Sequence, residues 1–175
     1  MSTKFNVYVR ELLCKDGTES GNDEIYMNVH GYPTPYASSF VPKDVRIPKN
    51  KKQHWSINND DTWYKIDYKL PWVWWSEPHG PFGGWQEQND DRPLESGPGW
   101  GIHTLTFTVK ESDDLSDEYI GKFSMRPMEG FGATWSALEH SKLQHDPRDP
   151  IMIVHCWGKN TDYRIKMEYG IHYGP

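Results

Sequence analysis

The feature of this sequence that most constrains its fold is a two-residue alternation of apolar and polar side chains, which returns between turn-forming residues. The clearest cases are residues 4–13, 24–30, 63–70, 103–110 and 163–173. Successive side chains of a β-strand point to opposite faces, so this pattern is typical of strands with one buried face. Weaker segments of the same kind occur at residues 45–47, 54–57, 119–125 and 151–157.

These segments predict an all-β fold, because turn residues separate them and helical segments do not alternate with them. We expect a single antiparallel β-sandwich of about eight strands that spans residues 1–175 as one domain. Only residues 133–143 have a pattern that suits a short helix, with Thr134 as its N-terminal cap.

Residues 71–101 interrupt the alternation with five prolines and five tryptophans. Proline suits neither a helix nor a central strand, so we expect a long ordered loop or an insertion there. An exposed indole ring can lie at a membrane interface or against a sugar, whereas a buried one supplies core area. Both readings stay open for the candidate ligand-binding residues Trp72, Trp74, Trp75, Trp85 and Trp100.

Two acidic turns share one layout, in which a strand runs into an acidic loop and the next strand opens with an acid. Calcium takes six to eight oxygen ligands, mainly from carboxylates and carbonyls, so a single turn rarely holds it. If both turns lie at one end of the sandwich, they form a candidate Ca²⁺ site. Its predicted ligands are Asp16, Asp23, Glu111, Asp113, Asp117 and Glu118. The alternative is that both loops are merely solvated turns.

The same residues resemble the calcium- and phospholipid-binding C2 domains, a family of eight-stranded sandwiches. The resemblance rests on Asp16 with Gly21-Asn22-Asp23-Glu24-Ile25-Tyr26, on Glu111-Ser112-Asp113 with Glu118-Tyr119-Ile120-Gly121, and on the closing strand from Tyr163. It implies a C2-like fold, a calcium site in the two turns and an anionic lipid partner. Three positions depart from the family pattern, since Glu111 and Glu118 replace aspartates and Glu24 replaces a proline.

Charge and motifs restrict the function. With 25 acidic against 19 basic residues and a net charge of −6, the chain is not expected to bind nucleic acid. It carries none of the common catalytic motifs.

We therefore expect a non-enzymatic module that binds anionic membrane or lipid head groups when calcium is present. The alternative is a lectin-like or toxin-like protein that binds glycans through its tryptophan-rich segment, with calcium structural or absent. A third reading is an assembly protein that uses exposed sheet edges.

The remaining signals are weak. Glu139, His140, His145 and Asp146 have metal-ligand side chains, but their stretch reads first as a turn. Two cysteines are too few for a disulfide scaffold, and they can pair only if their strands lie close. Without a membrane-spanning run or a signal-peptide pattern, we expect a cytoplasmic protein or one exported without a classical leader. The oligomeric state is not determined by the sequence.

Overall fold

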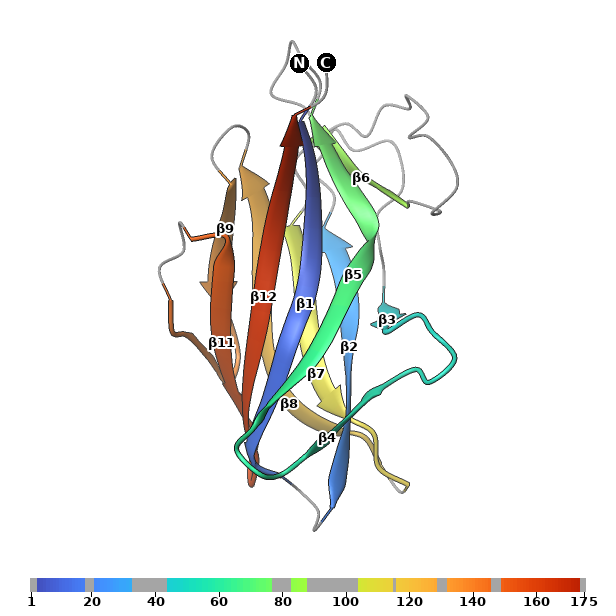
Figure 1. The fold of residues 1–175 in the computed structure, drawn as a ribbon, viewed down its shortest axis with the longest axis vertical. Coiled ribbons are helices and arrows are strands. Elements are labelled where there is room, and N and C mark those ends of the chain that lie inside the picture. The colour runs from blue at the N-terminus through green and yellow to red at the C-terminus, as the bar shows by residue number, and fades with distance from the viewer. Residues whose placement is uncertain are drawn as a thin grey trace.

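The chain folds into two antiparallel β-sheets that pack face to face (Figure 1). The computed structural model describes residues 3–17, 21–32, 44–76, 83–87, 104–114, 116–128, 132–145 and 149–173. Every regular element within these ranges is a strand. The strands are β1 (Thr3–Asp16), β2 (Asn22–Tyr32), β3 (Val45–Ile47), β4 (Trp55–Asn58), β5 (Trp63–Ser76), β6 (Gly83–Glu87), β7 (Thr104–Glu111), β8 (Glu118–Met128), β9 (Gly132–Ala137), β10 (Ser141–Leu143), β11 (Ile151–Trp157) and β12 (Asp162–Tyr173).

One sheet has the strand order β10-β11-β12-β1-β5-β6 and the other the order β3-β2-β7-β8-β9, with β4 also paired to β2. The long central strands β1 and β12 run antiparallel along almost their whole length. The all-β antiparallel sandwich predicted by the alternation is confirmed. The structure adds β6, β9 and β10 to the predicted strands.

The alternation in β1 changes phase halfway along the strand. The first half buries Val7 and Val9, whereas the second half buries Leu12 and Cys14. A β-bulge between Val9 and Glu11 causes this change, because it inserts one residue that has no partner on β12. The bulge therefore keeps both halves of β1 in the core despite the break in the two-residue period.

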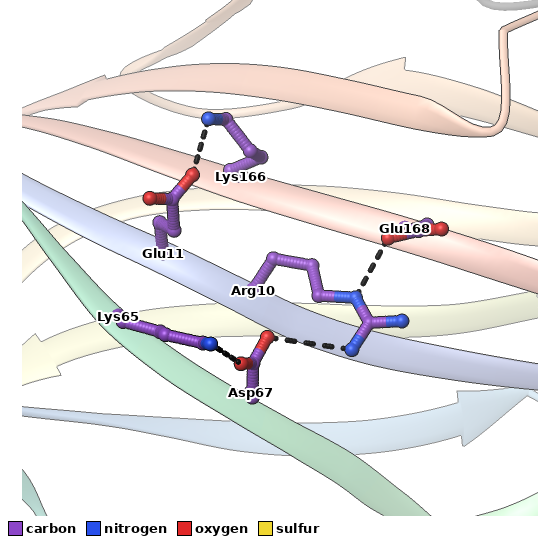
Figure 2. Close-up of polar contacts among 6 residues, drawn as sticks. All are labelled: Arg10, Glu11, Lys65, Asp67, Lys166 and Glu168. Carbon is purple, nitrogen blue, oxygen red and sulfur yellow. Dashed lines mark hydrogen bonds and ion pairs between the residues drawn. The ribbon is translucent and has the colours of Figure 1, made fainter.

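The same bulge turns two neighbouring charged side chains of β1 toward ion-pair partners on the flanking strands, as Figure 2 shows. Arg10 Nε donates to Glu168 Oε2 at 2.6 Å, and its Nη1 lies 3.3 Å from Asp67 Oδ1. Lys166 on β12 donates to Glu11. Such partly exposed pairs contribute about 0.2–1 kcal/mol each, so they fix register more than they add stability.

The predicted short helix over residues 133–143 is wrong. The chain forms β9 there, turns, and enters β10, so it passes from one sheet to the other. Backbone bonds hold this corner: Lys122 N donates to Glu139 O at 2.8 Å and Leu138 N donates to Lys122 O at 3.1 Å. Pairing with β8 and β11 overrides the local helix preference.

The long loop or insertion predicted for residues 71–101 is wrong for the described parts of that segment. Strand β5 runs through Pro71 to Ser76, and β6 pairs with it. Proline is tolerated because the ladder with β1 is irregular opposite it, between Asn6 and Tyr8. The rest of the predicted loop or insertion, residues 77–82 and 88–101, lies outside the described residues.

Candidate functional site

The described residues of the two acidic turns lie at the same end of the sandwich, which is lowest in Figure 1. The first turn connects β1 to β2, and the second connects β7 to β8, while β2 and β7 are neighbours in one sheet. Ser112 N, in the second turn, donates to Glu24 O on β2 at 2.8 Å. The hydroxyl of Tyr26 on β2 donates to Asp117 Oδ2. We call this end of the molecule, with both turns, the acidic end.

Asp23 points from β2 into the core instead of toward solvent, and its side chain is fully buried. Two side chains of the opposite sheet donate to its Oδ2, namely the hydroxyl of Tyr163 and, at 3.4 Å, the thiol of Cys14. Its Oδ1 is buried and has no hydrogen-bond partner among the described residues. Burying a carboxylate costs free energy unless both of its oxygens are hydrogen-bonded. Among the described residues only Oδ2 of Asp23 has donors, so the burial of Oδ1 is uncompensated there.

The two donors keep their protons at neutral pH. Burial, followed by the hydrogen bond to Asp23, holds the pKa of Tyr163 well above its usual range. Burial, followed by the charge of Asp23, raises the pKa of Cys14 to about 12. Cys14 is thus a buried donor, and both it and Cys156 are free thiols in the core. The two cysteines therefore do not pair.

The backbone of the first turn closes over this buried carboxylate. A Cβ atom added at Gly17 would lie 2.2 Å from Asp23 Oδ2, so a larger residue there would have to displace this carboxylate. The Asn59 amide supports the same turn in the orientation that satisfies both of its partners. It donates to Lys15 O at 3.1 Å and accepts from Gly17 N at 3.0 Å.

The other predicted metal ligands differ in exposure. Glu111 is buried at the end of β7 and lies opposite both Ile25 and Glu118 in the ladder, so it shares the inner face with Asp23. Glu118 is half-buried. Asp16, Asp113 and Asp117 are exposed around the two turns.

The acidic end does not gather the described carboxylates tightly. Within the described ranges, no three histidine, cysteine, aspartate or glutamate side chains come close enough to hold a metal ion. The same holds for the weak cluster of Glu139, His140 and His145; Asp146 lies outside the described residues.

The tryptophans of residues 71–101 belong to the core wherever their side chains are described. Trp72, Trp74 and Trp85 are 0%, 1% and 0% exposed, so as they stand they cannot contact a ligand in solvent. The side chain of Trp75 and the whole of Trp100 lie outside the described part of the chain.

The tryptophan-bearing half of β5 also lies far from the acidic turns. Ser76 of β5 pairs with Thr3 at the start of β1, whereas Trp63 pairs with Leu13 near the end of β1 that leads into the first turn. Strand β5 has 14 residues. At about 3.3 Å per residue, its length separates its two ends by roughly 45 Å. The core tryptophans and the acidic end therefore do not form one site.

Sequence reasoning missed the tyrosines that hold the acidic residues, Tyr26 and Tyr163. Tyr163 was predicted as a core residue from the alternation of the last strand, and it is 1% exposed. A buried tyrosine hydroxyl almost always needs a partner, so a polar core contact was the available signal. Which acid accepts this hydrogen bond depends on how the two sheets pack, and the sequence pattern does not predict that packing.

Comparison with known proteins adds no relative. No protein-family model matches the chain, and no curated protein matches its sequence. Among the described residues there is also no helix of the length and apolarity that a bilayer crossing requires.

Proposed function

We propose that this chain is a non-enzymatic, C2-like binding module whose acidic end binds Ca²⁺ and, through the ion, anionic lipid head groups. The observation that carries the proposal is the adjacency of the two acidic turns, tied by the Ser112–Glu24 and Tyr26–Asp117 hydrogen bonds. These two bonds support the inference that turns from distant parts of the sequence present carboxylates to the same region of solvent.

The donor set suits calcium, which prefers carboxylate and carbonyl oxygens. The exposed ligands would be Asp16, Asp113 and Asp117, with Glu118 at their inner edge. Asp23 would supply the buried Oδ1 that has no protein partner among the described residues. Because the carboxylates are not already gathered, binding must draw them together. We therefore expect weak affinity, with a dissociation constant of about 10⁻⁴–10⁻³ M.

The residues around the ligands keep them in place. Tyr26 holds Asp117 beside β2, and the Tyr163 hydroxyl fixes the buried carboxylate of Asp23. A bound divalent ion offsets the mutual repulsion of these acids. With a net charge of −6, the protein is repelled by an anionic surface when the ion is absent. Lipid binding is therefore expected to need calcium.

Vesicle co-sedimentation tests this proposal. We expect the protein to pellet with vesicles of phosphatidylcholine and phosphatidylserine in Ca²⁺, and to stay in solution in EGTA or with phosphatidylcholine alone. The double variant Asp113→Asn, Asp117→Asn should lose calcium-dependent pelleting, since it removes two ligand charges while the amide at 117 can still accept from Tyr26. The control Asp44→Asn changes an acid whose side chain is 85% exposed on β3's side of the molecule and should behave as wild type. Equal pelleting in Ca²⁺ and EGTA would count against the proposal.

The alternative of glycan binding through residues 71–101 loses three of its five candidate residues, because Trp72, Trp74 and Trp85 are buried in the core. Trp75 and Trp100 remain as candidates from that segment. An assembly role through sheet edges predicts concentration-dependent light scattering, which the same preparations can be used to measure.

A further inference from the structure

The hydroxyl of Tyr26 holds the Asp117 carboxylate on the outer face of the sheet that contains β2, β7 and β8. Along β2, the buried residues Asp23, Ile25 and Met27 face the other sheet. Tyr26 alternates with them, so its side chain points away from the other sheet. Its hydroxyl donates to Asp117 Oδ2, in the turn between β7 and β8. That carboxylate is therefore held on the side of the sheet that is turned away from the core.

The Tyr26 ring is packed firmly in this position. Arg46 of β3 covers it, with the guanidinium carbon 3.6 Å from the ring centroid. Arg46 Nε in turn donates to Gln53 O at 2.9 Å. Only 3% of the tyrosine is exposed. A ring that is packed in this way does not follow a moving carboxylate, so the hydrogen bond breaks if Asp117 moves toward the core.

Three other predicted calcium ligands lie on the inner face of the same sheet. Asp23 is fully buried there. Glu111 lies opposite Ile25 in the ladder, and Glu118 lies opposite Glu111. Because directly opposite residues of paired strands share a face, these three carboxylates point toward the core side of the sheet.

Asp117 cannot share one ion with the buried Asp23 while it accepts from Tyr26. Oxygens that bind one calcium ion, each at about 2.3–2.6 Å, lie within about 5 Å of one another. Asp23 and Tyr26 are three residues apart on β2, roughly 10 Å along the strand, and their side chains point to opposite faces. This separation agrees with the finding that no three such ligands are gathered within the described ranges.

Charge favours the outward position of Asp117 when no cation is bound. On the outer face, Arg46 covers Tyr26, and Lys110 lies directly opposite Tyr26 in the ladder. On the inner face, the acids of β2, β7 and β8 repel a further carboxylate. A divalent ion among those acids reverses the balance, because it attracts Asp117 more strongly than they repel it.

We propose that the Tyr26–Asp117 hydrogen bond is a latch that holds the calcium site in its unassembled state, and that calcium binding releases Asp117 toward the inner acids. This inference rests on the proposed calcium function and names a contact that controls the affinity of that site. The latch lowers calcium affinity, because its bond must break on binding. The Ser112–Glu24 backbone bond is separate from the latch, so the two turns stay tied when it opens.

Calcium titration of the Tyr26→Phe variant tests the latch, with ¹H–¹⁵N spectra recorded at constant ionic strength. We expect this variant to bind calcium about five-fold more tightly than wild type, since its Asp117 is already released. The matched control is Tyr64→Phe, whose hydroxyl donates to Asp60 Oδ2 at 2.7 Å. Because Asp60 is not a predicted ligand, this control should bind calcium like wild type.

Melting curves separate a latch from a bond that only supports the fold. In EGTA, Tyr26→Phe should melt at a lower temperature than wild type, because it lacks the hydrogen bond. In saturating calcium the two proteins should melt together, because the bond is then broken in wild type as well. A bond with a purely structural role would lower the melting temperature of the variant equally in EGTA and in calcium.

The tyrosine ring gives a direct readout of the release. In wild type, the ¹³Cζ resonance of Tyr26, assigned by its loss in Tyr26→Phe, should shift with the same midpoint as the amide resonances. The latch is overturned if wild type binds calcium while this resonance stays fixed, or if Tyr26→Phe binds calcium no more tightly than wild type. If neither protein binds calcium, the proposed function fails and the latch fails with it, whereas binding by the variant alone supports both.

Discussion

At the residue scale, the buried carboxylate of Asp23 is the most unusual group in the described part of the chain. Its Oδ2 accepts from Tyr163 and Cys14, and its Oδ1 has no described partner. Buried polar groups stabilise a fold only when they are bonded, and leaving one unbonded costs about 1–3 kcal/mol. Tyr163 is therefore a structural support for the acidic end as well as a core residue.

Replacing Tyr163 with phenylalanine tests that support. We expect Tyr163→Phe to lower the free energy of unfolding by about 1–3 kcal/mol, because Asp23 loses its closest donor. Urea denaturation should show a lower midpoint with an unchanged slope. The matched control is Tyr64→Phe, whose hydroxyl donates to Asp60 in an exposed position at 2.7 Å, and it should change stability by less than about 0.5 kcal/mol. Equal stability of Tyr163→Phe and wild type would show that the buried bond contributes nothing.

Residue by residue, the sequence predicted what was buried better than what each residue contacts. The alternation predicted Phe5, Val7 and Val9 as core, and all are buried. It could not predict that Asp23 turns inward, because an acid in a turn ordinarily faces solvent. Only the sheet-to-sheet packing that sets Tyr163 opposite Asp23 decides this.

At the scale of elements, Gly121 sets how closely β8 approaches the other sheet. A Cβ atom there would lie 2.7 Å from the His140 carbonyl and 2.9 Å from the Cβ of Cys156. Both contacts involve atoms that cannot swing aside. The glycine of the Ile120-Gly121 pair, a part of the C2-like resemblance, thus has a packing role in this chain.

Substitution of this glycine should separate the strands. We expect Gly121→Ala to destabilise the protein by about 1–3 kcal/mol, since the added methyl overpacks a rigid contact. Gly21→Ala is the control, because a Cβ at that position would meet nothing within 4 Å. Urea denaturation of the two variants measures the difference. If Gly121→Ala proved as stable as Gly21→Ala, the close approach would not be a constraint.

The strands were predicted with more success than their interruptions. Segments 24–30, 103–110 and 151–157 agree with β2, β7 and β11 within a few residues. Residues 133–143 have good local helix formers, but pairing with β8 and β11 makes them strands. Pro71 was read as the end of a strand, yet β5 continues past it at an irregular point of the ladder. In both cases contacts distant in sequence override a correct local preference.

At the scale of the whole molecule, buried acidic protons make stability depend on pH. Burial raises the pKa values of Cys14, Cys156 and Tyr26 to about 12, and that of Tyr163 further. Each folded-state pKa lies above its unfolded value, so each contribution is complete below the unfolded pKa and is lost as pH rises through the folded pKa. The free energy of unfolding should therefore fall from about pH 9 upward, by up to about 1.4 kcal/mol per pH unit for each group.

Urea denaturation between about pH 7 and pH 11 measures this fall, starting from the thiols. The variant Cys156→Ala removes one titrating group and should show a shallower decline than wild type, even though the lost side chain lowers its stability at neutral pH. A wild-type free energy that stays level up to about pH 10.5 would contradict the assigned shifts.

The sequence predicted which residues lie at one end of the sandwich better than it predicted how far β5 extends toward the other end. The acidic turns were predicted to meet at one end, and Ser112 and Tyr26 bridge them there. The last residues of β5, which include Trp72 and Trp74, lie instead toward the other end of the sandwich, because the length of β5 carries them there. Strand length follows from pairing with β1, and the prolines concealed that pairing.

The measurement that tests the central claim most directly is the thermal stability of the protein in Ca²⁺, Mg²⁺ and EGTA. At about ten times the dissociation constant, calcium should stabilise the wild type by about 1.4 kcal/mol. Magnesium should do less, because it demands a compact octahedral site, and the Asp113→Asn, Asp117→Asn variant should not respond. A wild-type melting temperature that is identical in millimolar Ca²⁺ and in EGTA would contradict calcium binding at the acidic end.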